Sequence, residues 1–263
     1  MRADKFFAEK FGSRTKSAEA IEKGWVLVNG KCIRPKDEIR ETDEITFAET
    51  ETRFVSNGGY KLAKGLKAFG VCCDNKVFVD IGASTGGFTD CLLQNGAKKV
   101  YAVDVGESQL HHSLRDNERV VVMDNRNARY LQREDFSDML DGVVTDVSFI
   151  SLRLIFPTIA GILKEQGEAL VLVKPQFECE NKNIGKSGIV HMSSHADIVK
   201  KVLSYATGEG LYPYGIINAP VRKGKNVEYV LYLKKSYEDA LNTDAIVTSV
   251  KKFAVLYAEG NLT

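Results

Sequence analysis

Four ionisable side chains, far apart in the sequence, stand next to the ends of predicted strands or helices. Lys61 opens a predicted helix at the end of a Gly-Gly-Tyr-Lys run, and Glu228 begins the last predicted strand. Asp146 and Lys174 each follow a predicted strand directly. Because ligands in open α/β sheets bind beyond the carboxyl ends of the strands, we expect Asp146 and Lys174 to face one crevice.

These residue types suit the removal of a proton from a poor nucleophile such as a ribose hydroxyl. Methyl transfer to such a group benefits from a base and from close alignment with the donor. A lysine acts as a base when burial or a second cation lowers its pKa, and Lys61 near Lys174 would supply that cation. Asp146 and Glu228 would orient the ammonium groups. The alternative for each residue is a surface charge in an ion-pair network.

Two other methyl-transfer chemistries lack their residues in this chain. Transfer to an exocyclic amine would need an Asn/Asp-Pro-Pro-aromatic stretch after the fourth strand, where this chain has Asp-Val-Ser-Phe from Asp146. Transfer to C5 of cytosine would need a cysteine nucleophile at that place, whereas Cys179 follows the fifth strand. The residue types at these positions therefore disfavour methyl transfer to an exocyclic amine and to C5 of cytosine.

A glycine-rich loop gives the clearest local pattern. The segment from Asp80 to Thr89, DIGASTGGFT, runs from a buried strand into a helix, and its glycines let the backbone approach a nucleotide-like ligand. It matches neither G-x-G-x-x-G nor the phosphate loop. The next strands end in Asp104, which can accept both ribose hydroxyls, and in Asp124, beside an adenine edge. Three acidic strand ends favour S-adenosylmethionine over NAD as the ligand. The alternative is that the glycines only form a tight turn between strand and helix and bind no ligand.

The elements that must position these side chains alternate between strand and helix from about residue 60. Strands are predicted at 77–80, 100–105, 120–123, 142–145 and 169–173, and helices at 60–69, 88–94, 152–163 and 195–205. This alternation predicts an α/β fold, a Rossmann-like, mainly parallel sheet covered on both faces. Segments 211–219 and 227–233 predict an antiparallel hairpin at one edge of that sheet.

The first 48 residues follow a different pattern. Helices are predicted over 3–11, with all three phenylalanines on one face, and over 17–23, where Ser17 would start the helix. The stretch 25–33 predicts a hairpin that turns at Asn29-Gly30. We therefore divide the chain into a small α+β domain over 1–48, a linker over 49–59 and a large domain over 60–263.

The composition is that of a globular protein, with 263 residues, 44% hydrophobic, 27% charged and a net charge of +1. Residues 1–36 hold nine Lys or Arg against four acids, and residues 37–51 hold seven acids against Arg40. Five cysteines without metal-ligand spacing indicate free thiols in a reducing compartment and no metal site. No signal peptide and no long apolar run are present, so we expect a cytoplasmic location and no membrane association.

These motifs resemble those of the TlyA-type (haemolysin A) family, in which an S4-like RNA-binding domain precedes an FtsJ-like rRNA methyltransferase domain. The resemblance covers essentially the whole chain, although Asn57 stands where that family often has Arg. The matching segments are RADKFF from Arg2, Ser13-Arg14, GWVLVNG from Gly24, FVSNGGYKL from Phe54, DIGASTGGFT from Asp80, TDVSFIS from Thr145, VKPQFE from Val173 and GKNVEY from Gly224.

The resemblance implies S-adenosylmethionine-dependent methylation of a ribose 2′-hydroxyl, that of cytidine in ribosomal RNA, with rRNA or ribosomal subunits as partners. It implies a catalytic tetrad of Lys61, Asp146, Lys174 and Glu228. The expected cofactor-binding residues are Asp80, Gly82, Ser84, Gly86, Gly87, Phe88, Asp104 and Asp124. The expected RNA-binding residues are Arg2, Lys5, Arg14 and Lys16.

Two other functions stay open at the level of the sequence. One is an RNA-binding or ribosome-assembly module without turnover, which loss of cofactor binding would favour. The other is a membrane-lytic protein, which the family name suggests and the absent membrane segment disfavours. The sequence carries no signal for an oligomeric state.

Overall fold

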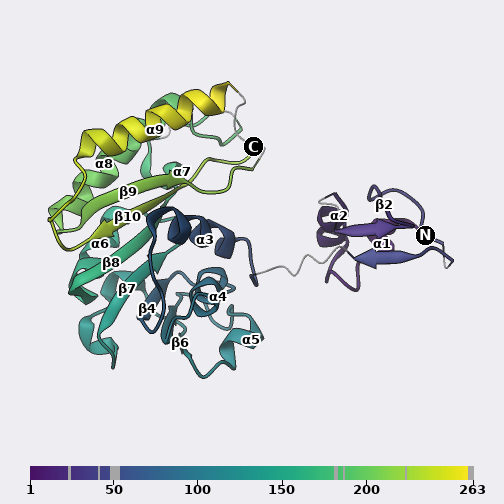
Figure 1. Cartoon of the computed structure of the whole chain (residues 1–263), viewed down its shortest axis with the longest axis horizontal. Helices are drawn as coiled ribbons and strands as arrows, with labels where there is room; N and C mark the ends of the chain where they lie inside the picture. The colour runs from purple at the N-terminus through teal and green to yellow at the C-terminus, as the bar shows by residue number, and fades with distance from the viewer. Residues whose placement is uncertain are drawn as a thin grey trace. The chain divides into compact units, whose positions relative to one another are not determined.

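The computed structural model describes residues 1–22, 25–40, 42–47, 54–180, 183–185, 187–222 and 224–259. The chain forms two compact units, Met1–Arg53 and Phe54–Thr263, whose elements are labelled in Figure 1. One hydrophobic cluster lies in the first unit and two lie in the second. Each unit is described by itself.

The small unit packs two short helices against a three-stranded antiparallel sheet. The left-handed φ angles of Asn29 and Gly30, 51° and 72°, are those that a two-residue hairpin turn requires. The predicted hairpin is confirmed, because Leu27 pairs with Cys32 across it. The elements are α1 (Ala3–Phe6), α2 (Arg14–Glu22), β1 (Val26–Val28), β2 (Lys31–Cys32) and β3 (Ile45–Phe47).

The structure corrects the predicted extents of both helices of this unit and adds one strand that was not predicted. Helix α1 is short, and Phe6 is 39% exposed whereas Phe7 is buried in the core. Helix α2 begins earlier than predicted because the Ser13 hydroxyl accepts a hydrogen bond from the Lys16 backbone N–H at 3.2 Å. Ser17 is therefore a buried residue inside the helix. Strand β3 was not predicted, since its three residues follow an acidic stretch.

The large unit is built on a seven-stranded sheet with the spatial order β6-β5-β4-β7-β8-β10-β9. Strands β4 to β8 are parallel, and β10 is antiparallel to both of its neighbours. The expected Rossmann-like sheet with a C-terminal hairpin is thus confirmed. The strands are β4 (Val77–Ile81), β5 (Lys99–Val103), β6 (Val120–Met123), β7 (Leu140–Thr145), β8 (Leu163–Val173), β9 (Tyr212–Asn218) and β10 (Tyr229–Lys234).

Helices cover both faces of this sheet, as Figure 1 shows. Alternate residues of β4 enter opposite clusters: Phe78 packs with α3, α4 and α5, and Val79 packs with α6, α8 and α9. The helices are α3 (Gly58–Phe69), α4 (Gly87–Gln94), α5 (His112–Arg115), α6 (Phe156–Ile162), α7 (Pro175–Glu178), α8 (His195–Gly208) and α9 (Thr243–Ala258). Short 3₁₀ turns are η1 (Ala128–Tyr130), η2 (Arg133–Asp135), η3 (Leu152–Leu154) and η5 (Met192–Ser194).

The two ends of the large unit differ from the predicted pattern. Helix α9 was not predicted; it buries Ile246, Val250 and Phe253 against α8 and β9. At the other end, Phe54 is buried, and the Val55 N–H donates to the Asp90 carboxylate at 2.7 Å. The segment before α3 therefore packs on this unit, ahead of residue 60.

Candidate active site

Three neighbouring strands and one helix bring the four predicted catalytic side chains together. Asp146 directly follows β7, and Lys174 directly follows β8. Glu228 directly precedes β10, which runs antiparallel to β8, so its beginning lies at the rim where β8 ends. Helix α3 carries Lys61 in its first turn and packs against β10. These four residues are called the tetrad below.

The tetrad is a row of alternating charges. Lys61 Nζ lies 2.7 Å from Glu228 Oε2 and 3.3 Å from Asp146 Oδ2. Lys174 Nζ lies 2.6 Å from Asp146 Oδ1 and donates a hydrogen bond of 2.7 Å to the Ser148 hydroxyl. The Asp146 carboxylate therefore stands between the two ammonium groups.

The tetrad is largely shielded from water. Lys174 is 8% exposed, and the side chains of Lys61, Asp146 and Glu228 are each about one fifth exposed. Charges removed from water interact more strongly than exposed ones, and a charge left without its partner there is costly. Such a row of shielded charges can hold a polar group in one orientation.

The glycine-rich loop between β4 and α4 passes through left-handed backbone at three positions. Gly82, Ser84 and Gly86 have φ angles of 80°, 48° and 93°. A β-carbon on Gly86 would lie 2.3 Å from Leu114 Cδ1, so both its backbone conformation and the space around it require glycine. The loop is consequently a fixed turn at the end of the central strand.

Asp80 anchors this loop from beneath. Its buried carboxylate accepts hydrogen bonds from the Thr89 N–H and hydroxyl, at 2.9 and 2.7 Å, which ties the end of β4 to the start of α4. Burial raises the pKa of Asp80 to about 7, against the lowering effect of the Thr89 hydrogen bonds. This carboxyl group therefore titrates near neutral pH.

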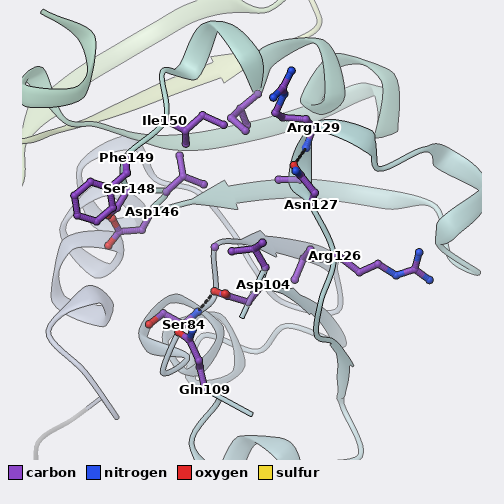
Figure 2. A pocket seen from close by; sticks show the side chains of 16 residues that line it. Ser84, Asp104, Gln109, Arg126, Asn127, Arg129, Asp146, Ser148, Phe149 and Ile150 are labelled. Atoms are coloured by element: carbon purple, nitrogen blue, oxygen red, sulfur yellow. Dashed lines mark hydrogen bonds between the residues drawn. The ribbon is translucent and has the colours of Figure 1, made fainter. Parts of the chain in front are cut away.

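A cavity of about 560 Å³ opens beside the loop and reaches the tetrad at Asp146. Figure 2 shows Ser84, Asp104 and Asp146 among the side chains that line it. Gly82, Ser84, Asp104 and Asp146 contribute to its wall. The Asp104 carboxylate accepts hydrogen bonds from the backbone N–H groups of Ser84, at 2.7 Å, and Gly106, at 2.8 Å. A smaller hollow adjoins it, and Gly87, Phe88 and Lys174 are among its lining residues. The volume of the larger cavity is in the range of small-molecule sites.

Asp124 follows β6, but its carboxylate is engaged elsewhere. It accepts hydrogen bonds from the Arg115 guanidinium at 2.7 Å and from the Ser108 N–H at 3.1 Å. The hydrogen bond from Arg115 holds the pKa of Asp124 below its usual value. Residues 126–129 form the cavity wall on this side, and Asp124 does not line it. A contact between Asp124 and a cofactor stays a prediction.

Sequence reasoning missed cavity residues that lie outside its motifs. Figure 2 shows that they come from the loops after β5, β6 and β7. In the sequence, they could have been found from their positions directly after predicted strands, where ligands bind in such sheets. Phe149 stands out in the structure alone, since it is 90% exposed and has a left-handed φ of 62°. The missed residues include Gln109, Arg126, Asn127, Arg129 and Phe149.

Helix α7 fastens the loop that carries Asp146. The Glu178 carboxylate accepts hydrogen bonds of 2.7 Å from the Ser151 hydroxyl and from the Leu152 N–H. The rings of Phe149 and Phe177 lie 5.0 Å apart. Because α7 directly follows Lys174 and its Glu178 binds the loop that carries Asp146, this short helix helps to position both residues of the Lys174–Asp146 ion pair.

The four residues predicted to bind RNA are exposed on the small unit. Arg2 and Arg14 both pair with the same oxygen of Asp4, at 2.9 and 3.0 Å. Asp4 is only 5% exposed, so it holds the two guanidinium groups side by side at the surface. Lys5 lies on α1 and Lys16 on α2.

The strand order, with β10 reversed beside β8 and a cavity at the glycine-rich loop, defines a Rossmann-like methyltransferase. The chain belongs to the FtsJ-like methyltransferase family, whose model matches residues 54–235. Residues 1–45 match the S4 domain. The resemblance seen in the motifs is thereby confirmed.

Named relatives span nearly the whole chain. It is 37% identical over 244 residues to the 16S/23S rRNA (cytidine-2′-O)-methyltransferase TlyA of Mycobacterium tuberculosis, with 91% of each chain covered. It is 41% identical over 228 residues to Hemolysin A of Brachyspira hyodysenteriae, which covers 84% of this chain and 93% of the relative. A solved structure from Streptococcus thermophilus has a TM-score of 0.74 at 36% identity, with 98% of each chain covered.

A helix that crosses a membrane is both long and apolar. Among the helices that the structure describes, none combines the two properties.

Proposed function

We propose that this chain transfers the methyl group of S-adenosylmethionine to the 2′-hydroxyl of a cytidine ribose in ribosomal RNA. The observation that carries the proposal is the tetrad, in which Lys174 is held by Asp146 and Ser148 beside the cavity. A ribose hydroxyl must lose its proton as the new bond forms, so it needs a positioned proton acceptor. The name of the mycobacterial relative assigns this reaction to that protein.

The cavity at the glycine-rich loop suits the cofactor. Each oxygen of the Asp104 carboxylate accepts one backbone N–H and keeps a lone pair, so the two oxygens can also accept the hydroxyls of an adenosine ribose. Gly82 and Ser84 bring the backbone to the cavity edge, and residues 126–129 would face the adenine. When bound, the cofactor supplies an electrophilic methyl group on a sulfonium.

The residues of the tetrad would then divide the reaction between them. The ribose O2′ would take the methyl group that the cofactor supplies, and the hydroxyl proton would pass to Lys174, whose ammonium group would first release a proton to solvent. Asp146 stabilises the ammonium group that this transfer creates, at a separation of 2.6 Å. Lys61, paired with Glu228 and Asp146, holds the other side of the acceptor.

The small unit would deliver the RNA. Arg2, Lys5, Arg14 and Lys16 present four cations on one compact S4 domain, and phosphate contacts by such cations dominate nucleic-acid affinity. Arg2 and Arg14 are already oriented by Asp4, which lowers the entropy cost of binding a phosphate. Ribosomal RNA or a ribosomal subunit is therefore the proposed partner.

The test is methyl transfer from radiolabelled S-adenosylmethionine to ribosomal subunits that lack their own modifications. Reverse transcription at limiting nucleotide then maps the product. Label recovered as 2′-O-methylcytidine supports the proposal and identifies the nucleotide. If cofactor binds but neither subunit accepts label, the proposal is wrong for ribosomal RNA, and a binding role without turnover takes its place.

A further inference from the structure

A second cavity, of about 230 Å³, adjoins the tetrad at Lys61 and Glu228. The glycine-loop cavities reach the tetrad at Asp146 and Lys174 instead, and the second cavity shares no lining residue with them. The tetrad therefore lies between the glycine-loop cavities and the second cavity. The former adjoin the predicted cofactor loop, and the latter opens toward the loop between β9 and β10.

The charges around the second cavity are unevenly compensated. Lys61 is paired with two carboxylates, whereas Arg222 and Lys225 are exposed and make no ion pair among the residues that the structure describes. The wall also holds the Glu228 carboxylate, which is paired with Lys61, and the neutral side chains of Gln176 and Asn226. An anion entering this cavity would thus meet two cations whose charge is not already neutralised.

The mouth of this cavity is held in place by hydrogen bonds. The Asn226 side chain accepts from the Val190 N–H at 2.8 Å and donates to the Gly188 carbonyl at 3.1 Å. The Lys225 N–H donates to the Arg222 carbonyl at 3.2 Å, which closes a turn between the two cations. Gly224, with a φ of 72°, supplies the left-handed residue of that turn. A backbone hydrogen bond therefore links the two cationic residues to each other.

We infer that the cavity binds the phosphodiester group next to the ribose that receives the methyl group. The inference rests on the proposed function. In RNA the 2′-hydroxyl and the 3′-phosphate sit on neighbouring carbon atoms, so a hydroxyl at the tetrad carries a phosphate with it. Arg222 and Lys225 line the cavity beside the tetrad, and neither is ion-paired with any residue in the described part of the chain. Arginine in particular matches two phosphate oxygens at once.

The experiment compares Arg222→Ala, Lys225→Ala and the double variant with the wild-type full chain, using unmodified ribosomal subunits as substrate. Lys251→Ala is the matched control, because Lys251 is an exposed cation on α9 outside both cavities.

The KM for RNA is expected to rise about tenfold for each charge-assisted hydrogen bond that is removed, with a smaller change in kcat. The slope of log affinity for RNA against log salt should fall by about 0.7–0.9 for each phosphate that is no longer neutralised. Arg222→Lys should recover much of the wild-type KM.

Cofactor affinity, measured by calorimetry without RNA, separates this site from the cofactor pocket. It should be unchanged in all variants. Reduced S-adenosylmethionine affinity would assign the cations to the carboxylate of the cofactor and would overturn the inference. An unchanged KM and salt slope in the double variant would overturn it as well. Failure of the proposed function is distinguishable, since the wild type itself would then transfer no methyl group to RNA.

Discussion

The ammonium group of Lys174 lies 2.6 Å from the carboxylate of Asp146, at the end of two adjacent parallel strands. The pair is shielded from water, yet Asp146 has a second partner in Lys61 at 3.3 Å. Loss of Lys174 therefore leaves no unpaired carboxylate, and the chemistry of Lys174 can be tested without loss of the fold.

Lys174→Ala is expected to lower methyl transfer by about 10²- to 10⁴-fold, the usual contribution of a positioned proton acceptor. S-adenosylmethionine affinity should stay within a few-fold of wild type, because Asp104 and the glycine-rich loop are untouched. Single-turnover kinetics and calorimetry check the two parts separately. Wild-type rates in this variant would remove Lys174 from the mechanism.

Asp104→Asn and Asp124→Asn are expected to differ in cofactor affinity. Asp104 lines the cavity and keeps acceptor capacity there, whereas Asp124 is engaged by Arg115 and Ser108. We therefore expect S-adenosylmethionine to bind about tenfold more weakly to Asp104→Asn, and to lose less affinity in Asp124→Asn. Equilibrium binding measures both. An equal or larger loss for Asp124→Asn would give that residue a direct contact with the cofactor.

Asp80→Asn tests the pH dependence of the large unit. The pKa of Asp80 is raised from 3.8 to about 7, so protonation favours the folded state at low pH. This contribution is complete below the unfolded pKa and is lost as pH rises through about 7. Asparagine keeps an acceptor oxygen for Thr89 without the charge. Between pH 4 and pH 8, the free energy of unfolding of the wild type should therefore fall by roughly 4 kcal/mol relative to that of Asp80→Asn.

The measurement is urea denaturation of both proteins across that pH range. Circular dichroism should report it, because the single tryptophan, Trp25, lies in the small unit. Stability curves that run parallel for the two proteins would show that Asp80 does not titrate in this range.

Glu178→Ala is expected to loosen the loop that carries Asp146. The substitution removes two hydrogen bonds of 2.7 Å, one of them from a buried backbone N–H, which should destabilise the large unit by about 1–3 kcal/mol. If the carboxylate acts by positioning, kcat falls while cofactor affinity changes little. Denaturation, kcat and calorimetry are compared with Ser151→Ala, which removes one of the two donors to Glu178 together with the acceptor of the Arg153 N–H. An unchanged kcat would leave Glu178 a role in stability alone.

Arg14→Ala is expected to weaken RNA binding and to lower the salt slope by about 0.7–0.9, the value for one phosphate that is no longer neutralised. Asp4 keeps Arg2 as a partner in this variant, so the small unit should still fold. Filter binding at several salt concentrations, with Lys251→Ala as the control, makes the comparison. RNA affinity equal to wild type would make Arg14 a structural partner of Asp4 only.

The sheet and the tetrad could be predicted because they depend on short local patterns. A strand followed by Asp146 and another followed by Lys174 must end at one rim if the strands are parallel, and β7 and β8 are parallel neighbours. The sequence predicted that Glu228 would orient an ammonium group, but not that this group would be that of Lys61. That pairing depends on β10 lying between β8 and β9, and on α3 packing against it.

Other features were missed for different reasons. Helix α9 does carry a helical pattern, since Ile246, Val250 and Phe253 recur at three- and four-residue spacing and are buried. The cavity wall at residues 126–129 has no such pattern. These residues share a surface only because the loop after β6 passes the end of β5, which is a property of the tertiary fold.

Strand β10 runs against its neighbours, so the chain reaches the tetrad through a loop that returns from β9. Residues within that loop lie outside the ladders, whose register is set by β8 and β10. Between Ala219 and Glu228, which are joined by a backbone hydrogen bond, the loop can therefore change in length and charge without shifting any strand. Apart from Glu228, the tetrad lies outside this loop, so the residues proposed to contact RNA can vary while Lys61, Asp146 and Lys174 keep their places.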